Sequence, residues 1–236
     1  ERTNVGNGPL SIGVGESIWV ANSRGSGVTK LDPGGDPLGE VNFDVVAQAY
    51  DVAVGDPDVW ILAEKIDRPE SMLFRVDPET ADVSDAFDLP GVSSLTLSFG
   101  HGSLWTSATP ASKPEQPQPD AQLLRIDPAT GEVVATVALK THSPGHIAFG
   151  ESNVMIIAGG SDDPQVITVD PATNEVAERF KIPGDLSVTD VAAAYGSLWV
   201  AGKDVYRLDA TSGKELASIK TDSPELLPPA DPHFEL

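Results

Sequence analysis

The chain has 236 residues, a formal net charge of −21 from 36 acidic and 15 basic residues, and no cysteine. A negative field of this size repels phosphate groups and anionic lipid headgroups, so we expect neither nucleic acid nor a membrane surface as a partner. Disulfides and thiolate metal sites are excluded, and no apolar run approaches the ~20 residues that a membrane-spanning helix needs.

In chain order, two short signals recur together five times. The first is an apolar run centred on Trp or Met, which recurs at intervals of 41, 45, 50 and 44 residues. Its central residues are Trp19, Trp60, Trp105, Met155 and Trp199. The second is a polar turn that follows each run and reads LDPGGDP, VDPETAD, IDPATGE, VDPATNE and LDATSGK. Five copies at this spacing indicate a repeat protein.

The third repeat shows most clearly what each unit forms. Its runs SLTLSF, SLWTSA, QLLRID and EVVATVAL are rich in Val, Leu and Ile and are bounded by Gly, Pro and Asp, as β-strands are. In the turn between the last two runs, Asp127 can accept hydrogen bonds from nearby backbone amides and Pro128 fixes φ. Gly131 supplies the left-handed position before the chain returns. The sequence contains no convincing run with the 3.6-residue periodicity that would predict a helix.

We therefore predict an all-β fold, namely a β-propeller of five blades with four antiparallel strands each. Residues 1–221 are expected to form its single domain, and the Pro-rich residues 222–236 a C-terminal tail. The opening TNVGNGP resembles the end of an outer strand, yet the fifth unit has its own outer strand in KELASIK. Either five blades close into a wheel, which we favour, or the chain belongs to a larger wheel.

The pattern GPLSIGVGESIWVAN…VTKLDP and its later copies, over roughly residues 8–221, resemble the bacterial propellers of the YVTN and streptogramin-lyase-like group. The resemblance implies the scaffold and leaves the function open, because that group includes lyases, surface proteins and sensor domains. Members also occur as extracellular portions of bacterial membrane proteins. Together with a start at Glu1 and a Pro-rich end, this implies an extracellular or periplasmic domain tethered to a membrane protein.

One polar residue per blade is expected at the mouth of the central channel. When the five innermost strands are aligned on an apolar residue that each contains, the residue directly before it is polar in every unit. These residues are Ser11, Asp51, Thr96, His146 and Asp190. We predict that they form a ligand-binding ring, and we add His142 to the candidate set.

Three uses of this ring remain open. Two carboxylates and two hydroxyls suit a hard cation, so Asp51 and Asp190 are candidate ligands of Ca²⁺ or Mg²⁺. With His146, the same groups can instead hold a small polar ligand or act as acid and base. The third alternative is that they satisfy exposed strand ends and organise water in the channel.

Three loops between second and third strands are expected on the same rim as the ring. They span residues 64–71, 108–122 and 159–164, and the second is Pro-rich and therefore stiff. Such loops either grip a ligand or partner or are tolerated insertions. The repeated Trp residues are expected to be core between blades, because Met155 replaces one of them.

The enzymatic alternative follows from the resemblance to streptogramin lyases, which implies elimination chemistry with Mg²⁺ and histidines. Their pattern places His directly after Pro at the start of an inner strand. Here Ser143-Pro144-Gly145-His146-Ile147 sets the His one residue later, which in a strand points the side chain to the other face, so the catalytic set is not carried over. The sequence also lacks a Gly-x-Ser-x-Gly elbow and a His-Glu-x-x-His motif.

We therefore expect a non-catalytic binding or sensor domain, monomeric, that recognises a small polar ligand or a protein partner at the rim that carries the ring. A metal-dependent lyase or another hydrolytic enzyme is the alternative. An enzyme should show a histidine with a perturbed pKa and a fixed metal, whereas a protein-binding rim should tolerate the loss of His146.

Overall fold

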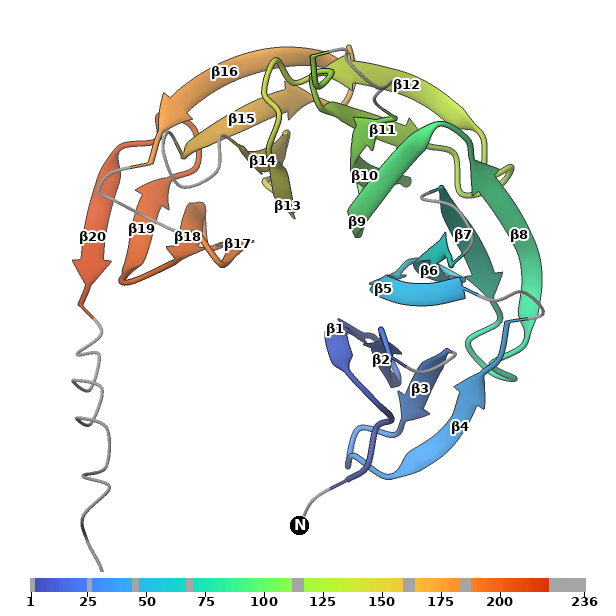
Figure 1. Cartoon of the computed structure of the whole chain (residues 1–236). Coiled ribbons are helices and arrows are strands. Elements are labelled where there is room, and N and C mark those ends of the chain that lie inside the picture. Colours follow the sequence, from blue (N-terminus) through green and yellow to red (C-terminus); the bar gives the residue numbers. More distant parts are fainter. Residues whose placement is uncertain are drawn as a thin grey trace, which may run out of the picture.

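The computed structural model describes residues 3–24, 27–43, 47–66, 70–111, 117–158, 164–182 and 188–220. Over these residues the chain forms 20 β-strands and no helix. The strands make five four-stranded antiparallel sheets, each built from four consecutive strands (Figure 1). This confirms the predicted all-β propeller of five blades. The proposed tail, residues 222–236, lies outside the described residues.

Each blade runs in chain order from its inner to its outer strand. Blade 1 consists of β1 (Pro9–Val14), β2 (Ile18–Asn22), β3 (Val28–Leu31) and β4 (Pro37–Val41). Blade 2 consists of β5 (Ala47–Val54), β6 (Val59–Lys65), β7 (Ser71–Val76) and β8 (Val83–Leu89). Blade 3 consists of β9 (Val92–Gly100), β10 (Ser103–Pro110), β11 (Gln122–Ile126) and β12 (Val133–Ala138). Blade 4 consists of β13 (Pro144–Phe149), β14 (Val154–Ala158), β15 (Gln165–Asp170) and β16 (Glu175–Lys181). Blade 5 consists of β17 (Asp190–Ala194), β18 (Ser197–Ala201), β19 (Val205–Asp209) and β20 (Glu215–Ile219).

The polar turns between third and fourth strands form as the sequence predicts. In blade 3, Asp127 Oδ1 accepts a 2.7 Å hydrogen bond from the backbone N–H of Ala129. The chain then returns through Gly131 in a left-handed conformation, at φ 70°. The same conformation is adopted by Ala81 (φ 63°), Asn174 (φ 59°) and Gly213 (φ 66°).

The outer strand of the preceding blade decides which residue can hold this left-handed position. Phe87 of β8 packs against the turn of blade 3, so a Cβ on Gly131 would lie 2.3 Å from its ring. Phe180 of β16 stands in the same relation to Gly213, at 2.1 Å. Where the outer strand carries Val instead, the turn residue keeps its side chain, as in the equivalent pairs Val41 with Ala81 and Val137 with Asn174.

Each blade packs one face on the following blade through its repeated Trp or Met. Trp19 shares a buried cluster with Val52 of blade 2, and Trp105 shares one with Ile147 of blade 4. Four of these side chains are at most 1% exposed, namely Trp19, Trp60, Trp105 and Met155. The prediction that they form core is confirmed for these four, whereas Trp199 in blade 5 is partly exposed.

A basic side chain covers each Trp from the neighbouring strand. The strand register pairs Trp19 with Lys30, Trp60 with Arg75, Trp105 with Arg125 and Trp199 with Arg207. The cations lie 5.3 to 5.9 Å from the ring centroids, within the range of cation–π attraction. Met155 faces Thr168 instead. The four blades that carry the Trp therefore also carry its basic partner, and blade 4, which carries Met155, has neither.

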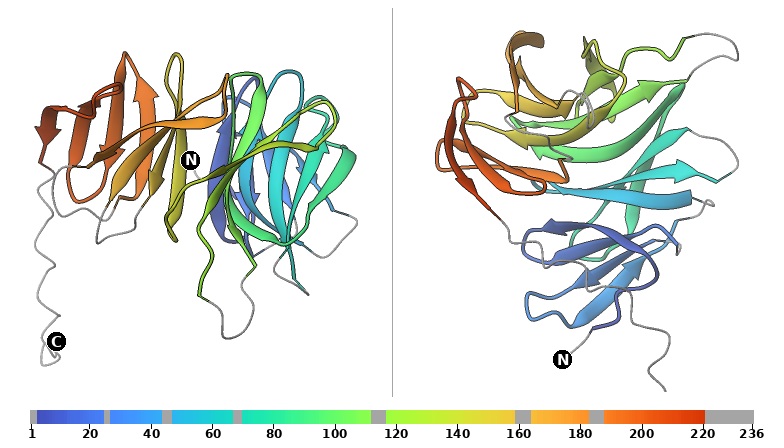
Figure 2. Two further views of the ribbon diagram at one scale, coloured as in Figure 1. Left: turned by 90° about the horizontal axis from the view of Figure 1, so that it is seen from above. Right: turned by 60° about the vertical axis from the view of Figure 1, so that its left-hand side comes forward.

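The five blades form an open arc, so the expectation of a closed wheel is wrong. The inner strands contact one another in the order β1, β5, β9, β13 and β17, but the described residues of β17 and β1 make no comparable contact. Figures 1 and 2 show the resulting gap between blade 5 and blade 1. In this arrangement the five blades do not complete the circle.

Candidate ligand site at the channel mouth

The five polar residues predicted to form a ring all line one cavity. This cavity lies among the inner strands of all five blades and has a volume of about 600 Å³. Its polar lining consists of Ser11, Tyr50, Asp51, Thr96, Ser98, His146, Thr189 and Asp190. The structure therefore brings the predicted set together, while the role of these residues as ligand contacts stays a prediction.

Breaks in the strand register lie next to the ring residues of four blades. The pairing of β1 with β2 skips from Pro9 to Ser11, and that of β5 with β6 skips from Ala49 to Asp51. Blades 3 and 4 are irregular at the corresponding place. Such bulges commonly re-aim a side chain beside a functional site. Repeat alignment finds the polar residues, but it does not reveal these bulges.

The bulge in β13 changes the interpretation of His146. Pro144 pairs with Ala158 and Ile147 pairs with Ile156, so Gly145 and His146 lie in the irregular stretch between them. Because strict alternation of faces holds only in a regular ladder, the one-residue offset from the lyase pattern does not by itself turn His146 away. The imidazole does line the cavity.

Asp51 connects three blades at the mouth. Its Oδ1 accepts hydrogen bonds from the Ser11 hydroxyl in blade 1 and from its neighbour, the Val52 N–H, at 2.8 Å. Its Oδ2 accepts a 2.7 Å bond from the Leu97 N–H in blade 3. Burial raises the pKa of the Asp51 carboxyl, and these three hydrogen bonds act in the opposite direction. Both oxygens are therefore already engaged by the protein.

Thr96 belongs to a similar network between blades 3 and 4. Its hydroxyl lies 2.6 Å from the Ser107 hydroxyl, which donates a 3.1 Å hydrogen bond to the carbonyl of Gly145. The Ser107 side chain is buried, so this bridge is shielded from water. Thr96 thus contributes to the cavity wall while its hydroxyl is held by the fold.

His146 and Asp190 form the accessible part of the ring. His146 Nδ1 lies 3.7 Å from Asp190 Oδ1, within ion-pair range once the imidazole is protonated. Their side chains are 48% and 73% exposed. Asp190 also accepts a 2.8 Å hydrogen bond from the Val191 N–H, which fixes one of its oxygens. This pair can contact a ligand without disturbing the rest of the mouth.

His142 lies with the Pro-rich loop and does not line the cavity. Its Nδ1 is 3.3 Å from the carbonyl of Pro119 and 3.7 Å from Asp120 Oδ1. The structure therefore separates His142 from the five ring residues. The central parts of the three rim loops, residues 67–69, 112–116 and 159–163, lie outside the described residues.

The described residues contain no group of three or more His, Asp or Glu side chains placed to hold a metal ion. Both oxygens of Asp51 already accept hydrogen bonds from the protein. The assignment of Ca²⁺ or Mg²⁺ to Asp51 and Asp190 gains no support from this geometry and stays a prediction. A membrane-spanning helix is likewise not found in the part of the chain that the structure describes.

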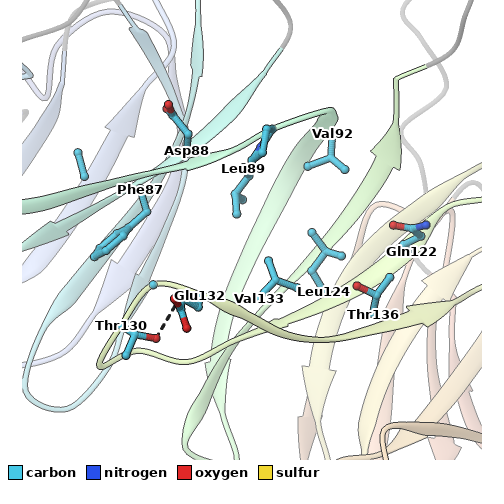
Figure 3. Close-up of a pocket in the computed structure, with 13 residues that line it drawn as sticks. Phe87, Asp88, Leu89, Val92, Gln122, Leu124, Thr130, Glu132, Val133 and Thr136 are labelled. Carbon is cyan, nitrogen blue, oxygen red and sulfur yellow. Dashed lines mark hydrogen bonds between the residues drawn. The ribbon is translucent and has the colours of Figure 1, made fainter.

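A second cavity, which the sequence did not suggest, lies between the outer strands of blades 2 and 3. It has a volume of about 640 Å³, and its lining is largely apolar (Figure 3). Phe87, Leu89, Val92, Leu124 and Val133 line it. Phe87 of blade 2 and Gly131 of blade 3, which lie against each other, both line it, so the groove follows the contact between these two blades.

Comparison with known proteins supports the fold and does not assign a family. No protein-family model matches the chain, and no curated protein matches it in sequence. Among solved structures, the Dos1 propeller is similar with a TM-score of 0.65 and 13% identity, over 89% of this chain and 57% of that one. Hydrazine synthase from Kuenenia stuttgartiensis gives a TM-score of 0.66 and 16% identity, over 90% and 66%. A nidogen/laminin complex gives a TM-score of 0.62 and 13% identity, over 90% of this chain and 80% of that chain.

The chain therefore spans less than two thirds of the length of the first two of these structures. At such low identity the likeness extends to the fold alone. The comparisons agree with the strand pairing in making this chain a β-propeller, and solved bacterial proteins are among the structures that it resembles.

Proposed function

We propose that this chain is a non-catalytic binding domain whose channel mouth recognises a cationic, hydrogen-bond-donating group on a small polar ligand or a protein partner. One observation carries the proposal: a cavity of about 600 Å³ receives a polar side chain from every blade, two of them carboxylates. Asp190 is 73% exposed, so its carboxylate can pair with an incoming ammonium or guanidinium group.

The rest of the mouth supports binding of this kind. Asp51 and its three donors hold the walls in one arrangement, so little ordering is needed when a ligand enters. The net charge of −21 attracts cations at long range and raises their rate of encounter. A partner with basic side chains fits this surface better than an anionic one.

We further infer that the chain belongs to the YVTN and streptogramin-lyase-like group of bacterial propellers and acts outside the cytoplasm. The repeat pattern over roughly residues 8–221 supports this assignment. The similar nidogen structure is of a complex with laminin, which agrees with recognition of a protein partner by this fold.

A lyase is the second candidate, and the pairing of His146 with Asp190 is the observation that favours it. A carboxylate beside an imidazole can orient the ring for proton transfer. The two candidates separate at His146, because a lyase would lose turnover in His146→Gln, whereas a binding domain would retain its ligand.

Isothermal titration with agmatine, which carries a guanidinium and an amine, tests the proposal. We expect measurable binding to the native chain and a loss of about 10- to 100-fold in affinity in Asp190→Asn. This is the range expected when one charge-assisted hydrogen bond is removed.

The chain offers a matched control in Asp120, which lies 3.7 Å from His142 as Asp190 does from His146, but outside the cavity. Asp120→Asn should leave agmatine affinity unchanged. Equal losses in the two variants, or no binding of agmatine by the native chain, would contradict recognition of a cation at the mouth.

A further inference from the structure

The outer strand of blade 3 lacks the residues that commonly protect the free edge of a β-sheet. β12 pairs with β11 on one side, and no described strand pairs with its other edge. Proteins usually protect such an edge with charged residues or proline. The other four outer strands read PLGEV, VSDAFDL, EVAERFK and ELASI, and each contains at least one charged residue. β12 reads VVATVA and contains neither a charged residue nor a proline.

The exposure and the register of β12 agree with an edge that is open to pairing. Val133 and Val134 are 42% and 56% exposed, and Thr136 and Ala138 are exposed as well. A bulge lies at Val134, but all five outer strands have one at this place, so it does not distinguish β12. From Ala135 to Ala138 the pairing with β11 is regular. An extended segment of another chain can therefore add to this edge as a further strand.

The apolar groove between blades 2 and 3 lies beside this edge (Figure 3). Val133 and Thr136 of β12 line it together with Leu124 of β11. Phe87 and Leu89 of β8 line it from blade 2. Because side chains alternate along a strand, every second side chain of an added strand would point to this face of blade 3. The edge and the groove thus combine main-chain pairing with a pocket for side chains, as strand addition requires.

The charged residues that line the groove are both acidic. They are Asp88 and Glu132, and both are exposed. Asp88 Oδ1 is engaged by Lys65 Nζ at 2.6 Å. No hydrogen bond or ion pair holds the Glu132 carboxylate within the part of the chain that the structure describes. A segment with a Lys or Arg beside its apolar side chains therefore fits this groove better than an acidic one.

We propose that an extended segment of a partner protein adds to the free edge of β12, with a bulky apolar side chain in the groove against Phe87 and a Lys or Arg beside Glu132. This surface is separate from the channel mouth, since the two cavities share no lining residue. A second copy of the chain is a poorer occupant, because two copies that each carry −21 repel one another. Binding at this edge is also independent of cation recognition at the mouth.

Fluorescence anisotropy with a labelled peptide tests the proposal. The capped peptide Lys-Val-Thr-Phe-Thr-Val-Lys presents its apolar side chains on one face, and a Lys at each end allows one of them to meet Glu132 in either strand direction. We expect the native chain to bind it saturably at concentrations of up to about 1 mM. The same peptide with all its backbone amides methylated keeps the side chains but cannot donate hydrogen bonds to β12, so it should not bind.

Val133→Lys should weaken binding of the peptide by at least about 10-fold, because it removes an apolar contact and sets a like charge against the peptide. Leu38→Lys on β4 is the matched control, since Leu38 is 57% exposed on the outer strand of blade 1 and the net charge changes equally. It should bind the peptide like the native chain. Equal losses in the two variants would overturn the proposal, because attraction to the acidic surface as a whole would then account for binding.

Glu132→Gln tests the charged side of the groove. It should weaken binding by about 2- to 5-fold, the range of an exposed ion pair. Asp82→Asn should leave binding unchanged, since Asp82 holds the equivalent position in the turn of blade 2 and lies outside the groove. Loss of binding in Asp190→Asn together with full binding in Val133→Lys would overturn the proposal, because it would place the peptide at the channel mouth.

Three further results would also contradict strand addition at β12. The first is no saturable binding of the peptide by the native chain, and the second is equal binding of the methylated and unmethylated peptides. The third is self-association of the native chain in sedimentation velocity that Val133→Lys abolishes, since a second copy would then be the occupant of this edge.

Discussion

The ring residues of blades 1 to 3 are held by hydrogen bonds within the channel mouth, whereas the ring residues of blades 4 and 5 are largely exposed to solvent. Asp51 accepts three hydrogen bonds from three blades, and Thr96 is held by Ser107. His146 and Asp190 face each other at 3.7 Å and remain about half or more exposed. The same ring position in the repeat is thus hydrogen-bonded within the protein on one side and accessible to solvent on the other.

This difference arises from the local backbone and from the neighbouring blades. The break in the strand register beside Asp51 sets the carboxylate against the N–H of Leu97, and blade 1 supplies a third donor in Ser11. Asp190 lies in a strand without such a break. It also borders the open end of the arc, where no described blade follows to offer donors.

The largest expected effect comes from breaking the bonded side. Asp51→Ala removes an acceptor from two backbone N–H groups and one hydroxyl, so we expect the free energy of unfolding to fall by about 2 to 4 kcal/mol. Urea denaturation measures it. Asp190→Ala is the matched variant and should change stability by less than about 0.5 kcal/mol, as exposed substitutions do. Equal losses in the two variants would show that the two sides of the mouth do not differ.

A smaller loss is expected when the bridge between blades 3 and 4 is removed. Ser107→Ala deletes the hydroxyl that joins Thr96 to the carbonyl of Gly145. We expect a fall of about 1 kcal/mol in the free energy of unfolding, typical of one buried hydrogen bond. Agmatine affinity should not change, and a loss of binding would place Thr96 among the ligand contacts.

The pH dependence of folding stability, a smaller effect, also tests whether Asp51 is buried on the bonded side of the mouth. Burial raises the folded-state pKa of Asp51 above its unfolded value, so the folded state binds this proton more tightly. Its contribution to stability is therefore complete below the unfolded pKa, about 3.9, and is lost as the pH rises through the folded pKa.

Asp209, which lies on an exposed turn, has a pKa shifted in the opposite direction to that of Asp51. Hydrogen bonds from Ser212 and Thr211 lower the pKa of its carboxyl, so its contribution is present above the unfolded pKa and is lost as the pH falls through the folded value. Carbon-13 NMR of the two carboxyl groups should give a higher pKa for Asp51 than for Asp209. The reverse order would contradict the burial of Asp51.

Much of this architecture can be predicted from the repeats. The turn chemistry at Asp127 and Gly131, the buried Trp positions and the alignment of the ring residues all follow from local patterns that recur five times. The proximity of Ser11 and Asp190 in one cavity follows in turn, because equivalent strands surround one channel.

The rest depends on contacts between blades that no repeat encodes. Whether the wheel closes depends on the angle at which neighbouring blades pack, and contacts such as that of Trp105 with blade 4 join residues far apart in the sequence. The donors to Asp51 come from two other blades and from a local bulge, so its bonded state could not be predicted. The groove at Phe87 depends on which outer strand meets which turn.

The central claim is that the exposed His146–Asp190 side of the mouth binds a cationic group while the bonded side holds the shape. The most direct test is a titration of isotope-labelled protein with agmatine, followed by the backbone amide shifts in two-dimensional NMR. We predict the largest changes at residues 145–147 and 189–191, with smaller changes at 51–52 and 96–97. Changes centred on Phe87 and Val133 in the outer groove, or spread evenly over the acidic surface, would contradict the account.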